Sequence, residues 1–88
     1  MKTAFRDSFA KDLKNIRDKA ALRKIKELIE AVGLSDSLSP IPNLKKLKGH
    51  EHYYRLRAGD YRIGIALKSD TVIFVRALNR KDIYKYFP

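Results

Sequence analysis

Arginine residues gather in the second half of the chain, where their spacing could serve phosphate chemistry. Arg55 and Arg57 alternate with other side chains in a strand-like segment, and Arg62 follows a short turn. Arg80 and Tyr84 stand four residues apart near the end of the sequence. A guanidinium group donates paired hydrogen bonds from a planar fork and stays charged at any working pH, which suits it to bind phosphate. The arginines are therefore candidate phosphate-binding residues for the backbone of RNA or DNA, and Tyr84 would add a hydroxyl to them if the terminal segment folds back.

A second basic stretch precedes the arginines and is expected to bind nucleic acid without sequence preference. It comprises Lys45, Lys46, Lys48, His50 and His52. Affinity that comes from such phosphate contacts falls steeply with salt. The two histidines would share one side of an extended segment but lack a third ligand, so no metal site is expected and a phosphate-contacting or surface role is favoured.

The chain as a whole is strongly basic. Its 88 residues hold 20 Lys and Arg against 10 Asp and Glu, a formal net charge of +10. Residues 45–88 carry eleven basic and four acidic side chains, against nine and six in residues 1–44. A field of this strength attracts polyanions or acidic proteins, and the second half is the expected anion-binding half.

Length and residue usage narrow the class of protein further. A chain of 88 residues fits one domain, residues 1–88, with one core. The absence of cysteine excludes a disulfide framework and a thiolate zinc site, and no metal or other cofactor is expected. The charged opening at residues 1–7 lacks the apolar stretch of a signal peptide, and no run approaches the roughly 20 apolar residues of a membrane span. A cytoplasmic protein without a membrane partner is expected.

The first half of the chain has the apolar period of helices. A short strand is expected around residues 2–6, and Asp7 or Ser8 is expected to cap a first helix. Asp18 is expected to cap a second helix, and Gly33 is expected to end it in the left-handed conformation.

From residue 53 onward the apolar period changes to two. Segments 53–57, 61–67 and 71–77 read as strands joined by short turns, which predicts an antiparallel meander with the Met1 end beside its last strand. The remaining residues, 79–87, predict a turn or one coil of helix. The expected fold class is α+β, with two N-terminal helices packed on one face of a small, mostly antiparallel four-stranded sheet.

Strand geometry should bring the arginines together. Successive side chains of a strand point to opposite faces, so Arg55 and Arg57 share a face. A two-residue loop at 58–59 or 59–60 would set Arg62 opposite Arg55 or Arg57 respectively, on that same face. Facing like charges destabilise a sheet, so such a cluster favours an external anion, although a cationic face without a ligand is the alternative reading.

Three segments resemble the RelE/ParE superfamily of toxins from bacterial and archaeal toxin–antitoxin pairs, most closely the RelE mRNA interferase branch. They are Leu44–Gly49 (LKKLKG), Tyr53–Ile63 (YYRLRAGDYRI) and Leu78–Tyr84 (LNRKDIY). The resemblance implies a single RelE-like toxin domain, a ribosome-dependent endoribonuclease that cleaves mRNA in the decoding site, silenced by a cognate acidic antitoxin. The alternatives are a ParE-like inhibitor of DNA gyrase without nuclease activity, or a catalytically weak nucleic-acid-binding relative.

The resemblance also assigns roles to residues. The family's functional positions are matched here by Arg55, Arg57, Arg62, Arg80 and Tyr84. The implied reaction is attack of the ribose 2′-hydroxyl on the adjacent phosphate, in which arginines stabilise the dianionic phosphorane. A guanidinium group is effectively never deprotonated, and the best-known members carry lysines where this chain has Arg55 and Arg57. The proton acceptor is therefore open between Tyr84, the first choice, Tyr86 and a histidine.

Overall fold

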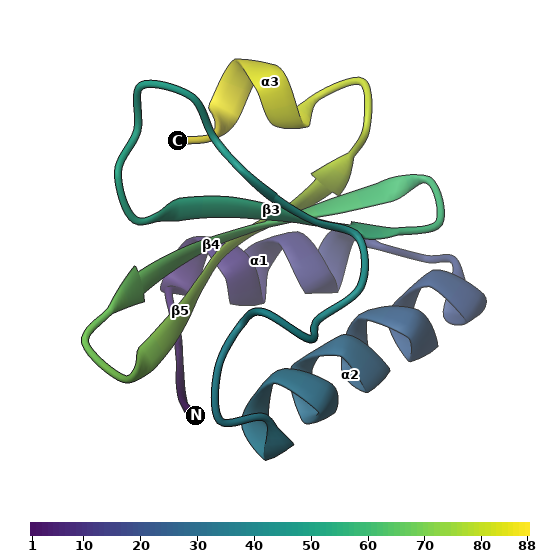
Figure 1. The fold of residues 1–88 in the computed structure, drawn as a ribbon. Coiled ribbons are helices and arrows are strands. Elements are labelled where there is room, and N and C mark those ends of the chain that lie inside the picture. Colours follow the sequence, from purple (N-terminus) through teal and green to yellow (C-terminus); the bar gives the residue numbers. More distant parts are fainter.

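A five-stranded sheet separates two helices from a third (Figure 1). The computed structural model describes residues 1–88. In chain order the elements are β1 (Lys2–Phe5), α1 (Asp7–Asn15), α2 (Lys19–Leu34), β2 (Leu44–Lys46), β3 (Tyr53–Ala58), β4 (Tyr61–Lys68), β5 (Thr71–Asn79) and α3 (Ile83–Tyr86). Helices α1 and α2 cover one face of the sheet, and α3 lies over the other. None of these helices is long and apolar enough to span a membrane.

The strand order is β1-β5-β4-β3-β2, with β1 parallel to β5 and every other pair antiparallel. The predicted α+β class, the meander and the pairing of the N-terminal strand beside the last meander strand are confirmed. The predicted count of four strands is wrong, because β2 adds a fifth at the sheet edge. Two of its three residues are exposed lysines, so it has no alternating apolar pattern that would mark it as a strand.

The helix boundaries follow the sequence only in part. Asp18 caps α2 as predicted, because its side chain accepts hydrogen bonds from the backbone N–H groups of Ala20 (2.9 Å) and Ala21 (3.2 Å). The predicted cap on α1 is wrong: its first residue is Asp7, and no side chain caps it. The predicted stop at Gly33 is also wrong, because α2 continues through this residue to Leu34.

The hydrophobic core lies between the sheet and the α1–α2 layer. Its most completely buried side chains are Phe9, Ile25, Val32, Leu56, Ile63, Ile65, Val72 and Phe74. Burial of such a side chain contributes about 1.5–3 kcal/mol to the free energy of unfolding. The apolar residues of the strands therefore face α1 and α2. The polar residues between them are thereby left on the opposite face of β3 and β4.

Candidate functional site

The hairpin of β3 and β4 gathers the predicted arginines on the face opposite α1 and α2. Its loop is Gly59-Asp60, because Ala58 pairs with Tyr61, and Arg62 therefore stands directly opposite Arg57. Arg55 stands opposite Gly64, and on its other side it pairs with Lys45 of β2. Of the two registers open from the sequence, the structure has the one with the loop at residues 59–60.

No carboxylate neutralises this group of cations. The three ion pairs of the structure are Lys2–Asp70, His52–Glu51 and Arg76–Asp12. Arg62 donates from Nη1 to the backbone carbonyl oxygens of Gly59 (2.8 Å) and Tyr61 (3.0 Å), which orients its guanidinium without cancelling its charge. The carboxylates of Glu27 and Asp60 line the adjoining groove without pairing with these arginines, so the face presents positive charge that an external anion can neutralise.

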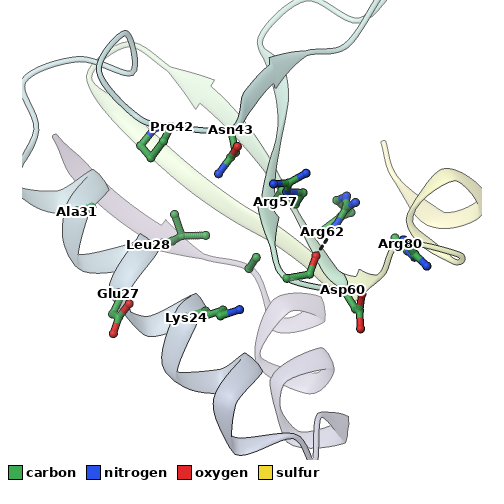
Figure 2. A pocket seen from close by; sticks show the side chains of 12 residues that line it. Lys24, Glu27, Leu28, Ala31, Pro42, Asn43, Arg57, Asp60, Arg62 and Arg80 are labelled. Atoms are coloured by element: carbon green, nitrogen blue, oxygen red, sulfur yellow. Dashed lines mark hydrogen bonds between the residues drawn. The ribbon is translucent and has the colours of Figure 1, made fainter.

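A groove beside the hairpin extends the cationic face to the C-terminal segment. It has a volume of about 720 Å³ and runs between α2 and the β3–β4 hairpin. Figure 2 shows Arg57 and Arg62 side by side in it, with Arg80 beyond them and Lys24 reaching in from α2. The backbone N–H of Arg80 donates to the carbonyl oxygen of Asp60 (2.8 Å), which fixes the segment after β5 to the hairpin loop.

Two further hollows continue the same surface toward the edge strand. A hollow of about 360 Å³ is lined by Arg55, Arg57, Arg62 and Lys45 among others. The next, of about 400 Å³, is lined by Lys45, Lys46, Leu47, Lys48, His50, Arg55, Tyr84, Phe87 and Pro88. Neighbouring hollows share arginines or lysines, so the surface from Arg80 to Lys48 is one continuous strip, called the basic strip below. Its length is suited to several consecutive phosphates of a nucleic-acid strand.

The C-terminal segment folds back onto the sheet and brings Tyr84 to Arg55. The Arg55 guanidinium carbon lies 4.6 Å from the centroid of the Tyr84 ring, a cation–π contact, while Tyr84 stays 70% exposed. Phe87 anchors the segment: its ring packs on Gly64 so closely that a Cβ there would lie 2.6 Å from ring carbons. Tyr84 is thus a reachable phenol held beside a fixed cation.

The structure separates the remaining candidates. His50 joins the basic strip, whereas His52 lines none of its hollows and lies 4.0 Å from the Glu51 carboxylate. Tyr86 faces Arg76, 5.7 Å from its guanidinium carbon, rather than the arginine cluster, and it is exposed. No three His, Asp or Glu side chains come together as metal ligands.

One ion pair was missed from the sequence. Arg76 donates from Nε and Nη2 to the two carboxylate oxygens of Asp12 (2.7 and 3.0 Å), and the backbone N–H of Ala77 donates to the same carboxylate (2.9 Å). The hydrogen bond to Asp12 raises the pKa of Arg76 above its ordinary value, against an opposing effect of burial. A signal was present: Asp12 follows Phe9 by three residues and precedes Ile16 by four, which places it on the apolar face of α1.

Comparison with known proteins agrees with this fold. The family model for the ParE toxin of the type II toxin–antitoxin system parDE matches residues 4–84. Toxin RelE3 of Methanocaldococcus jannaschii is 47% identical over 89 residues, covering 100% of both chains. A putative toxin RelE1 of the same organism is 36% identical over 77 residues, covering 82% of this chain and 80% of the relative.

Solved structures of toxins from toxin–antitoxin pairs have the same fold as this chain. The chain matches the RelB–RelE antitoxin–toxin complex from Methanococcus jannaschii with a TM-score of 0.80 and 47% identity, covering 97% of this chain and 99% of the other. The YoeB dimer from Staphylococcus aureus matches with a TM-score of 0.73 at 21% identity, covering 91% and 97%, and supports the fold alone.

Fold and comparisons define a small α+β toxin of the type II toxin–antitoxin class. The chain belongs to the ParE toxin family, within the RelE branch of the RelE/ParE superfamily. The membership predicted from the three sequence segments is confirmed.

Proposed function

We propose that this toxin is a ribosome-dependent endoribonuclease that cleaves mRNA in the decoding site. The observation that carries the proposal is the convergence of Arg55, Arg57 and Arg62, none of them paired with a carboxylate, on one face with Tyr84. Phosphoryl transfer needs positive charge held where the phosphorane forms, and guanidinium forks supply it. A proton acceptor in the adjoining hollow, where Tyr84 lies beside Arg55, completes the minimum requirement for 2′-hydroxyl attack.

Each side chain takes a role suited to its position. Arg57 and Arg62, which face each other, bind the scissile phosphate and stabilise the charge of the phosphorane. Tyr84, in its phenolate form, accepts the 2′-hydroxyl proton. Arg80 extends the same groove, and Lys45, Lys46 and Lys48 hold phosphates on the other side of the cut.

The cognate partner is inferred to be an acidic antitoxin. RelB–RelE antitoxin–toxin complexes are known from Methanococcus jannaschii and Pyrococcus horikoshii. A net charge of +10 and a basic strip whose arginines form no ion pair within the chain fit a partner that supplies carboxylates. Such a partner would cover the groups that otherwise contact RNA.

The test is cleavage of an mRNA programmed on purified ribosomes, with the new ends mapped by primer extension. The wild-type chain is expected to cut only ribosome-bound mRNA and to leave a 5′-hydroxyl end. Arg62→Ala is expected to lower the single-turnover rate by about 10²–10³-fold, the usual loss for one transition-state donor. Arg23→Ala, which removes an exposed arginine of α2 outside the basic strip, is the matched control and should cut like wild type. Cleavage of free RNA at the same rate, or equal loss in both variants, would contradict the proposal.

A second function is kept because the matching family model bears the ParE name. In that case the chain inhibits DNA gyrase by binding and has no nuclease chemistry. A supercoiling assay with purified gyrase distinguishes the two: inhibition together with intact mRNA on ribosomes would favour the second function. If mRNA stays intact and gyrase is unaffected, the remaining alternative is a nucleic-acid-binding protein of low catalytic activity.

A further inference from the structure

Two histidines of similar sequence context lie in different surroundings. Both belong to the loop between β2 and β3, which rises beside α3 in Figure 1. His50 lines the hollow of about 400 Å³ that also contains Arg55 and Tyr84. His52 adopts the left-handed backbone conformation (φ 71°), lies outside that hollow, and contacts Glu51. Only one of the two imidazoles therefore faces the proposed reaction.

A series of aromatic contacts orients the His50 ring. It packs edge-on against Tyr53, with centroids 6.4 Å apart and an interplanar angle of 83°. Tyr53 packs edge-on against Phe87 at 5.7 Å, and Phe87 rests on Gly64 in the middle of the sheet. The imidazole is thus exposed to solvent yet tied to the same anchor that holds Tyr84 over Arg55.

The proposed reaction still needs a proton donor for the leaving 5′-oxygen. The titratable and charged side chains around His50 are those of Lys45, Lys46, Lys48, Glu51, His52, Tyr53, Arg55 and Tyr84. Arginine does not release its proton, and Tyr84 is already assigned as the acceptor. An imidazole exchanges protons between about pH 5 and 8, which matches the task better than a lysine ammonium does.

We infer that His50 is the general acid of the cleavage, an inference that rests on the proposed ribonuclease function. As the 2′-oxygen forms its bond to phosphorus, the 2′-hydroxyl proton passes to the phenolate oxygen of Tyr84, which becomes a neutral phenol. The bond from phosphorus to the 5′-oxygen breaks, and that oxygen takes the proton of the His50 imidazolium. The products are a 2′,3′-cyclic phosphate and a 5′-hydroxyl, and both side chains regain their protonation states by exchange with water.

The experiment compares His50→Gln with His52→Gln, two exposed loop substitutions of the same kind, in single-turnover cleavage of ribosome-bound mRNA from pH 5 to 9. His50→Gln should lower the rate by about 10²–10³-fold without changing the ribosome concentration that gives half the maximal rate. The wild-type rate should level off as the pH rises, because loss of the His50 imidazolium offsets the gain of Tyr84 phenolate, whereas the rate of His50→Gln should keep rising to pH 9. His52→Gln should stay within about twofold of wild type across the profile.

A substrate with sulfur in place of the 5′-oxygen at the cut site isolates the role of the acid. A thiolate leaves without protonation, so His50→Gln should cut this mRNA within about threefold of wild type. If the sulfur substrate fails to restore the rate, or if His52→Gln shows the larger loss, His50 is not the acid. If both histidine variants cut normally while wild type is active, the inference falls but the ribonuclease stands. An inactive wild type on ribosomes would remove the proposed function itself.

Discussion

Arg76 and the pair of Arg57 and Arg62 show two opposite uses of arginine within one sheet. Arg76 makes a bidentate ion pair with Asp12, in which the side chains are 24% and 9% exposed. Arg57 and Arg62 face each other on adjacent strands, and neither has a carboxylate partner. All three residues are arginines of the same charge. The presence or absence of a carboxylate partner is what distinguishes Arg76 from Arg57 and Arg62.

The difference follows from what each arginine has beside it. Strand β1 pairs with β5 only as far as Phe74, so the edge of β5 beyond this residue has no strand partner. Helix α1 covers this edge: the Ser8 hydroxyl donates to the carbonyl oxygen of Val75 (2.6 Å), and Asp12 binds Arg76 and Ala77. Beside β3 and β4, Glu27 of α2 and Asp60 of the hairpin loop line the groove, but neither carboxylate lies within ion-pair distance of Arg57 or Arg62. The first arginine is therefore structural, and the other two remain available to a ligand.

Asp12→Ala should cause the largest loss of stability. It strands the partly buried Arg76 guanidinium and leaves the N–H of Ala77 without its acceptor, so the free energy of unfolding should fall by about 3 kcal/mol. Urea unfolding at neutral pH measures it. The double variant Asp12→Ala with Arg76→Met should recover part of the loss, because the unpaired charge is gone. A loss below about 1 kcal/mol would mean that the ion pair does not hold α1 on β5.

The pH dependence of this ion pair has a defined sign on the arginine side. The pKa of Arg76 is raised in the folded protein, so its contribution is fully present below its ordinary pKa and is lost only as the pH rises through the folded value. Arg76 itself should therefore contribute no change in unfolding free energy between pH 7 and 10.

Gly64→Ala should have the next largest effect, through the C-terminal segment rather than through charge. The new Cβ would lie 2.6 Å from the Phe87 ring, so Phe87 must leave and α3 with it, at a cost of about 2 kcal/mol. Tyr84 then loses its place over Arg55, and cleavage should fall by about tenfold or more. Gly33→Ala is the control: nothing lies within 4 Å of a Cβ there, and a helical alanine should stabilise by about 0.5 kcal/mol. Equal behaviour of the two variants would show that Phe87 does not position Tyr84.

The repeat of apolar residues predicted the strands and the faces of their side chains. It did not predict contacts between distant elements or positions where the backbone leaves a regular conformation. Alternation and a two-residue loop were enough to place Arg62 opposite Arg55 or Arg57, and the structure selects Arg57. The Asp12–Arg76 pair was not predictable in this way, because it joins residues 64 positions apart on α1 and β5 that neither an apolar repeat nor a short turn relates. His50 and His52 were expected on one side of an extended segment, but the left-handed backbone of His52 separates them.

Arg57→Ala should have the smallest effect on stability and tests the comparison most directly. Removing an exposed cation that faces Arg62 relieves a repulsion, so the free energy of unfolding should change by less than about 0.5 kcal/mol, in the stabilising direction. Any gain should shrink as salt is raised from 0.05 to about 1 M, because the Debye length falls to about 3 Å and the repulsion is screened. Arg76→Ala, measured beside it, should be clearly destabilising, since it leaves the Asp12 carboxylate buried without its cation. If both substitutions lower the free energy of unfolding by the same amount, Arg57 has a structural partner as Arg76 does. The basic strip would then lack the unpaired charge from which RNA binding is inferred.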